Sequence, residues 1–170
     1  MKLYTTAVAP NPRRVSIFLA EKGIDIPVEE LNLGNLENLA PDFVAKNPMG
    51  RVPMLEMDDG TYLAESLAIC RYFEEIQPEP PLFGVGAQNK AEVEMWNRRM
   101  EFEVLGMISQ CFRNTHPYWE GKIPQVKEHG ELCRTTVMQR MEWLDSELAD
   151  REFIAGDCFT VADITAHTGF

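Results

Sequence analysis

From Asn47 to Phe73 the chain reads NPMGRVPMLEMDDGTYLAESLAICRYF, and the first domain is organised around this segment. Residues 54–57 (MLEM) form a short apolar segment. The Asp-Gly pair at 59–60 predicts a hairpin turn, because glycine adopts positive φ angles without steric cost. Residues 61–63 (TYL) are rich in β-forming side chains, so they predict the return strand of a β-hairpin.

A helix is predicted directly after this hairpin, opening at Glu65-Ser66. Its apolar residues Ile69, Phe73 and Ile76 recur at spacings of i, i+4 and i+7. This periodicity is typical of a helix with one buried face.

Pro53 opens the first strand of the hairpin, which predicts either an edge position or a cis peptide bond. A strand edge that ends beside a helix N-terminus offers free backbone groups and the positive end of a helix dipole. Such an arrangement suits an extended, anionic peptide.

Three segments of this stretch resemble the glutathione-binding half of soluble glutathione transferases. They are N-P-x-G-R-V-P at 47–53, D-D-G-T at 58–61 and E-S-x-A-I-x-R-Y at 65–72. The order of strand, hairpin, Glu-Ser and helix is matched without a gap. The combination is therefore specific, whereas a Val-Pro or Glu-Ser dipeptide alone would be weak evidence.

The residues before this stretch predict the rest of a first domain. Residues 2–5 and 26–31 read as strands, 13–22 as a helix and 41–46 as a short helix. Asn11 followed by Pro12 fits a helix N-cap with proline at the first helical position. The order βαβ, short helix, ββα is thioredoxin-like, with a right-handed parallel crossover.

The rest of the chain predicts a separate domain of helices. Residues 77–87 hold three prolines and two glycines and form the linker between domain 1–76 and an all-helical domain 88–170. An apolar stripe of period 3.6 runs from residue 93 to 112, and a second helix covers 126–148. The fold class is therefore α/β plus all-α.

The tail of the chain continues the resemblance. Phe-Ile-Ala-Gly-Asp at 153–157, followed by Thr-x-Ala-Asp at 160–163, is similar to a helix-start motif of the same family. Residues 160–163 also have the shape of a capping box with an acidic third position. Family members usually continue through further C-terminal helices, so we expect the helical domain to be incomplete relative to the family.

Composition narrows the class of function. A net charge of −11 repels phosphates, which argues against nucleic-acid binding. The chain has no apolar run of membrane-span length and starts without the apolar core of a signal peptide, so a cytoplasmic protein with no membrane partner is expected. The four cysteines form no C-x-x-C pair, which predicts neither a metal site nor a disulfide framework.

The resemblance implies glutathione as co-substrate. Glutathione carries two carboxylates, one ammonium and a thiol, and the site has to bind each of these groups. Ser66 is placed to bind the γ-glutamyl carboxylate, and Glu65 the ammonium. Val52 is expected to pair its backbone with the cysteinyl part if Pro53 is cis. Arg51 corresponds to the basic residue that often holds the glycyl carboxylate. The alternatives are a plain helix cap at Glu65-Ser66 and a solvated surface role for Arg51.

The motifs do not identify the residue that activates the thiol sulfur of glutathione. Many bacterial members place a serine four residues before the arginine that corresponds to Arg13, and that position is Ala9 here. The tyrosine of other classes would fall near Ala7. Asn11 is the first candidate, since some relatives use an asparagine near this helix start, and Thr6 is the second. The alternative for Asn11 is a helix cap and no more.

The resemblance thus implies a glutathione transferase that conjugates glutathione to a hydrophobic electrophile, held against the helical domain, and that forms a homodimer. The competing hypothesis is a non-catalytic binding or scaffold protein of the same fold, which Ala9 favours. A glutathione-dependent isomerase is less well supported, because its Ser/Cys-rich first loop is missing. Fold alone does not decide between these chemistries.

Overall fold

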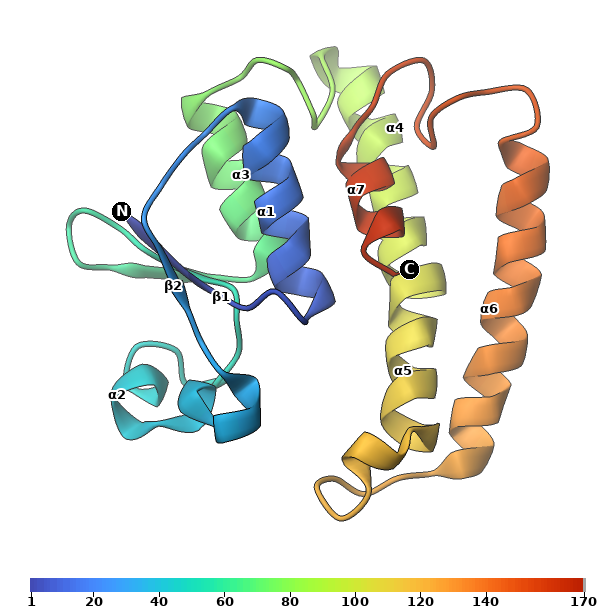
Figure 1. The fold of residues 1–170 in the computed structure, drawn as a ribbon. Coiled ribbons are helices and arrows are strands. Elements are labelled where there is room, and N and C mark those ends of the chain that lie inside the picture. Colours follow the sequence, from blue (N-terminus) through green and yellow to red (C-terminus); the bar gives the residue numbers. More distant parts are fainter. Residues whose placement is uncertain (170) are drawn as a thin grey trace. The chain divides into compact units, whose positions relative to one another are not determined.

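A computed structural model describes residues 1–169, and the chain divides into two compact units, Met1–Pro81 and Leu82–Phe170. The first unit is a four-stranded sheet with helices, and the second is built from helices (Figure 1). The predicted combination of a thioredoxin-like domain and a helical domain is confirmed.

The first unit follows the predicted order of elements. They are β1 (Lys2–Thr5), α1 (Pro10–Lys22), β2 (Val28–Glu30), α2 (Pro41–Val44), β3 (Met54–Glu56), β4 (Tyr62–Ala64) and α3 (Ser66–Ile76), with two 3-10 turns, η1 (Leu33–Asn35) and η2 (Glu37–Leu39), before α2. The strand order is β2-β1-β3-β4, with β1 and β2 parallel and the other pairs antiparallel. Gly60 has the positive φ expected of the hairpin turn, at 81°.

Helices α1 and α3 lie side by side and pack together to form the main core (Figure 1). Its fully buried side chains are Leu3, Val15, Phe18, Leu55, Ile69 and Phe73. The prediction that Ile76 shares this buried face is wrong, because Ile76 is 53% exposed. It is the last residue of α3, where the chain leaves the core.

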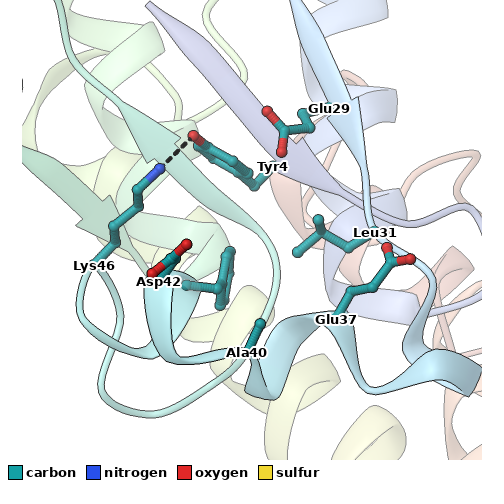
Figure 2. Close-up of a pocket in the computed structure, with 8 residues that line it drawn as sticks. Tyr4, Glu29, Leu31, Glu37, Ala40, Asp42 and Lys46 are labelled. Carbon is teal, nitrogen blue, oxygen red and sulfur yellow. Dashed lines mark hydrogen bonds between the residues drawn. The ribbon is translucent and has the colours of Figure 1, made fainter.

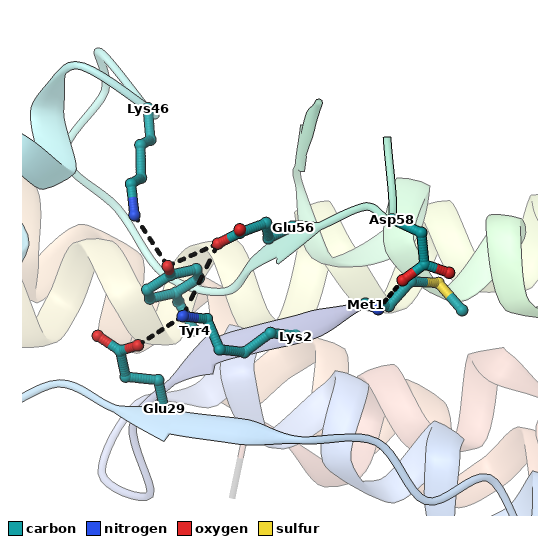
Figure 3. Close-up of polar contacts among 7 residues, drawn as sticks. All are labelled: Met1, Lys2, Tyr4, Glu29, Lys46, Glu56 and Asp58. Atoms are coloured by element: carbon teal, nitrogen blue, oxygen red, sulfur yellow. Dashed lines mark hydrogen bonds and ion pairs between the residues drawn. The ribbon is translucent and has the colours of Figure 1, made fainter. Parts of the chain in front are cut away.

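The other face of the sheet carries α2 and a line of charged and phenolic groups (Figure 3). The Tyr4 hydroxyl donates to Glu56 Oε2 at 2.7 Å and accepts from Lys46 Nζ at 2.9 Å. These hydrogen bonds raise the pKa of Lys46 and lower the pKa of Glu56, because each stabilises a charged form. Beside them, Lys2 Nζ donates to Glu29 Oε2 at 2.9 Å.

The second unit begins with a long, nearly continuous helix. It consists of α4 (Gly86–Arg99), a π-helical segment η3 (Met100–Leu105) and α5 (Gly106–Thr115). A 3-10 turn, η4 (Pro117–Trp119), leads to α6 (Lys127–Glu147), which packs along α5, and α7 (Val161–His167) packs against α4.

The π segment corrects the predicted apolar stripe. Its first half is buried as expected, at Val93, Trp96, Met100 and Val104. Beyond η3 the stripe is only partly buried, and Phe112 is 43% exposed. A π turn inserts an extra residue into the helical repeat, so residues after it no longer continue the 3.6-residue face.

The capping box at the start of α7 is confirmed. Thr160 Oγ1 accepts from the Ala162 N–H at 3.3 Å, and Asp163 Oδ2 accepts from the Thr160 N–H at 2.8 Å. Asp163 Oδ1 also accepts from the Ile154 N–H at 2.8 Å, so one carboxylate ties the preceding loop to the helix.

We therefore expect Asp163→Ala to lower the free energy of unfolding by about 2 kcal/mol, because two partly buried N–H groups lose their acceptor. Urea unfolding followed by circular dichroism measures the loss. Asp157→Ala, at an exposed position in the same loop, is the control. Equal stability of the two variants would contradict the role assigned to Asp163.

Candidate functional site

Three strands of the first unit end together at one end of the sheet. The register pairs Tyr4 with Met54 and Met54 with Ala64. Extending the antiparallel register by two residues places Thr6 and Ser66 on either side of Val52. The sheet end therefore brings together candidate residues from three distant parts of the sequence.

The loop before β3 is built around Asn47, which is only 5% exposed. Its Nδ2 donates to the Arg51 carbonyl at 2.7 Å, and its Oδ1 accepts from the Met49 N–H at 3.3 Å. The Val52–Pro53 peptide bond is cis, as expected from the sequence. The Arg51 side chain is exposed, whereas Val52 is half-buried. The sequence alone does not indicate this role of Asn47, although the residue opens the N-P-x-G motif.

Glu65 and Ser66 form the start of α3. Glu65 has φ of 69° and ψ of 117°, and its exposed side chain makes no capping hydrogen bond. Glu65 therefore occupies the N-cap position of α3 without capping the helix through its side chain. A non-glycine residue with a positive φ is a strained conformation that is often retained at functional sites. Without a side-chain cap, the first N–H groups of α3 are available to an anion.

The start of α1 differs from the prediction. The helix begins at Pro10 with Ala9 as N-cap, and Ala9 makes no side-chain capping bond. Asn11 is therefore a helical residue and not the predicted cap. Because Pro10 already has the φ angle of a first helical residue, the helix starts earlier than at Arg13. Asn11 is exposed, and its Oδ1 accepts a hydrogen bond from Arg14.

Arg14 joins the starts of the two helices and was missed by sequence analysis. Its side chain is buried, with the residue 1% exposed. Nη1 donates to Ser66 Oγ at 2.7 Å and to Asn11 Oδ1 at 3.3 Å. The only sequence signal was a charged residue directly before the buried Val15. Its partner in α3 lies 52 residues away along the chain, which a local pattern does not show.

Two uncapped helix N-termini and a buried guanidinium thus meet at the sheet end. We call this set of residues the sheet-end cluster: Thr6, Asn11, Arg14, Val52, Glu65 and Ser66. Thr6 is 5% exposed, and Asn11 is the more open of the two candidates for sulfur activation. The electrostatics of the cluster favour a ligand that carries a carboxylate.

The thiol nearest to this cluster along α3 does not supply a nucleophile. Cys70 lies one turn after Ser66 and is fully buried. Burial raises the pKa of the Cys70 thiol to about 12, although the Arg14 charge acts in the opposite direction. The group therefore stays protonated near neutrality and is not a reactive thiolate.

A second concave region lies on the α2 face of the sheet, with a volume of about 270 Å³ (Figure 2). Its lining combines apolar side chains with three carboxylates and one ammonium: Tyr4, Leu31, Ala40, Phe43, Glu29, Glu37, Asp42 and Lys46. The ammonium already donates to the Tyr4 hydroxyl. The excess of carboxylates disfavours an anionic peptide, so the sheet-end cluster is the better candidate.

Residues 1–169 contain no group of three or more His, Cys, Asp or Glu side chains arranged to hold a metal ion. Over the same range, no helix combines the length and apolar character needed to cross a membrane.

Comparisons with known proteins identify relatives of the whole chain. The family model described as "Glutathione S-transferase, N-terminal domain" matches residues 8–76. Glutathione S-transferase 2 of Saccharomyces cerevisiae is 39% identical over 173 residues, covering 99% of this chain and 74% of the yeast protein. Glutathione S-transferase GstA of Escherichia coli is 31% identical, covering 86% of this chain and 70% of that protein. The crystal structure of yeast Gtt2 superposes with a TM-score of 0.92 at 38% identity, over 99% of this chain and 83% of the yeast chain.

Proposed function

Because the chain belongs to the glutathione S-transferase family, we propose that it binds glutathione at the sheet-end cluster and transfers its sulfur to an electrophilic small molecule. The observation that carries this proposal is the meeting of two uncapped helix N-termini at the buried Arg14–Ser66 hydrogen bond. A net charge of −11 means that only such a local arrangement attracts an anion.

The γ-glutamyl end of glutathione fits the start of α3. Ser66 offers its hydroxyl and the first backbone N–H of the helix to the carboxylate. The Glu65 side chain, exposed beside it, offers a carboxylate to the ammonium.

The rest of the peptide fits the loop before β3. Val52 lies at the N-terminal end of β3, where its backbone can pair with the cysteinyl part as an added strand. The exposed Arg51 side chain is free to reach the glycyl carboxylate.

The chemical step requires a thiolate. A free thiol has a pKa of about 8.5, so donors aimed at the sulfur increase the fraction that is ionised at neutrality. The sulfur electron pair then forms a bond to the electrophilic carbon, and the displaced leaving group takes the electrons of the broken bond. Orientation and desolvation of the two substrates supply most of the rate enhancement.

Two kinds of measurement test the proposal. Retention on immobilised glutathione and calorimetric titration measure binding, and a chromogenic assay measures conjugation. Binding together with conjugation supports the transferase. Binding without conjugation of any electrophile in a broad panel would favour the non-catalytic binding protein. Absence of binding at millimolar glutathione would contradict both.

We expect Asn11→Ala to raise the pKa of the bound glutathione thiol while leaving the affinity nearly unchanged. One neutral amide N–H stabilises thiolate over thiol. The strongest oxyanion donors lower an activation barrier by about 2.7–4 kcal/mol, and we expect a smaller effect here, about 1 kcal/mol. Thiolate absorbance titrated against pH measures the shift.

Thr6→Val is the matched control for this titration. A shift in Thr6→Val and not in Asn11→Ala would transfer the role to Thr6. An unchanged curve in both variants would leave the activation to backbone donors at the start of α1.

We also propose a symmetric homodimer. The apolar stripe expected to cover the interface is partly buried within the helical unit itself, with Trp96 only 7% exposed. Met95 and Phe102 are instead 42% and 58% exposed, so this part of the long helix carries apolar side chains on its surface. Light scattering at micromolar concentrations should give twice the monomer mass, and Phe102→Glu should give the monomer mass. A monomeric wild type would contradict the proposal.

A cytoplasmic role in detoxification is part of the same proposal. All four cysteines are free thiols, as is usual for proteins in a compartment where glutathione maintains reducing conditions.

A further inference from the structure

We infer that Arg14 is a positioning residue that orients Asn11 and Ser66 at the same time, and so couples the sulfur end of glutathione to its γ-glutamyl end. The inference rests on the proposed function. Arg14 itself is buried and contacts two candidate ligand-binding side chains from the protein interior.

The hydrogen-bond chemistry of a guanidinium fixes the direction of both contacts. Arginine only donates, so Ser66 Oγ and Asn11 Oδ1 must both accept from Arg14 Nη1. The hydroxyl hydrogen of Ser66 is therefore left for another acceptor. The Asn11 amide is likewise held with its Oδ1 toward Arg14, so its two N–H groups are directed elsewhere.

The hydrogens that remain on Ser66 Oγ and Asn11 Nδ2 are donors, and they favour acceptor groups on the ligand. A carboxylate at Ser66 and a thiolate at Asn11 are acceptors, so each matches the group that faces it. A neutral thiol or an ammonium at the same places would meet donors and bind less well. Arg14 thus makes the cluster select the ionised forms of both groups.

Burial makes this arrangement rigid and electrostatically strong. Arg14 is 1% exposed, and its bond to Ser66 joins α1 to α3 at 2.7 Å. A charged donor in a poorly solvated site gives a shorter and stronger hydrogen bond than a neutral one. The positive charge also acts on a nearby thiol, since it opposes the effect of burial on the pKa of Cys70.

The test uses Arg14→Lys, which keeps the charge but has a shorter side chain and lacks the planar guanidinium whose Nη1 serves both acceptors. We expect it to weaken glutathione binding about tenfold or more and to raise the pKa of the bound thiol by about 1. Calorimetry measures the first and thiolate absorbance the second. S-methylglutathione, which has no thiol, should lose affinity to a similar extent because its γ-glutamyl end is unchanged.

The coupled response identifies the role. Asn11→Ala alone should move the thiol pKa and little of the affinity, whereas Arg14→Lys should move both. If a folded Arg14→Lys variant moves only one quantity, or neither, the inference is overturned. If wild type does not bind glutathione, the proposed function itself fails, whatever the Arg14 variants do.

A double-mutant cycle covers the case in which Arg14→Lys does not fold. Glutathione affinity is compared in Asn11→Ala, Ser66→Ala and the double variant, each of which leaves Arg14 in place. Because one guanidinium contacts both side chains, the two changes should combine non-additively by a factor of about 2 or more. Additive changes would overturn the inference.

Discussion

Replacing Lys22 with methionine should lower the free energy of unfolding by about 3–5 kcal/mol, the cost of breaking a buried ion pair by removing one partner. The Lys22 ammonium is fully buried and lies 2.5 Å from Glu74 Oε2. It also donates to three backbone carbonyls after α3: Gln77 at 2.8 Å, Pro78 at 3.2 Å and Pro80 at 2.5 Å. One side chain at the end of α1 therefore satisfies the C-terminal end of α3 and the segment that follows.

Urea unfolding measures this loss, and Lys2→Met is the matched control. Lys2 pairs with Glu29 at 2.9 Å, but both side chains are largely solvated, so its loss should leave the free energy of unfolding nearly unchanged. Adding Glu74→Gln to Lys22→Met should recover part of the stability, because the buried carboxylate charge is removed together with its partner. Similar stability of Lys22→Met and Lys2→Met would show that the buried network is not stabilising.

The sequence predicted most of what depends on local chemistry. The Asp-Gly turn, the strand and helix order, the cis bond at Pro53 and the capping box at Thr160 were all read from neighbouring residues and are confirmed. Each depends on residues that are close together in the sequence: a glycine at the turn, a proline at the cis bond, or side chains within four residues at the cap.

The predictions that failed concern where a helix starts and which face of a helix is buried. Asn11 was expected to cap α1, but two nearby prolines allowed more than one start, and the helix begins at Pro10. The π segment shifted the apolar face of the long helix, which a fixed period of 3.6 does not reveal.

The buried cations were the hardest features to predict. Arg14 and Lys22 lie on an amphipathic helix, where charged residues are normally expected on the solvated face. Their partners Ser66 and Glu74 are both 52 residues away in the sequence, on α3. Only the packing of α1 against α3 shows that these charges are buried and partnered.

The second large effect is expected at the candidate site itself. Ser66→Ala should weaken glutathione binding by about 1.5–3 kcal/mol, the range for a hydrogen bond to a charged group, which is about a 10- to 150-fold change in the dissociation constant. The substitution removes the hydroxyl that would bind the γ-glutamyl carboxylate. It also removes the acceptor of Arg14 Nη1, so the guanidinium loses the contact that ties α1 to α3 at this point.

Ser16→Ala is the matched control for this variant. Ser16 is exposed on α1, and its hydroxyl donates to the Pro12 carbonyl at 3.3 Å, so the same chemical change is made away from the sheet-end cluster. Calorimetric titration of wild type and both variants with glutathione and with S-methylglutathione separates the two ends of the ligand. Equal losses for the two ligands in Ser66→Ala would locate the effect at the γ-glutamyl end, since the thiol is absent from one of them. An unchanged affinity would mean that the start of α3 serves only the fold, and the glutathione-binding role would then have to lie elsewhere in the first unit.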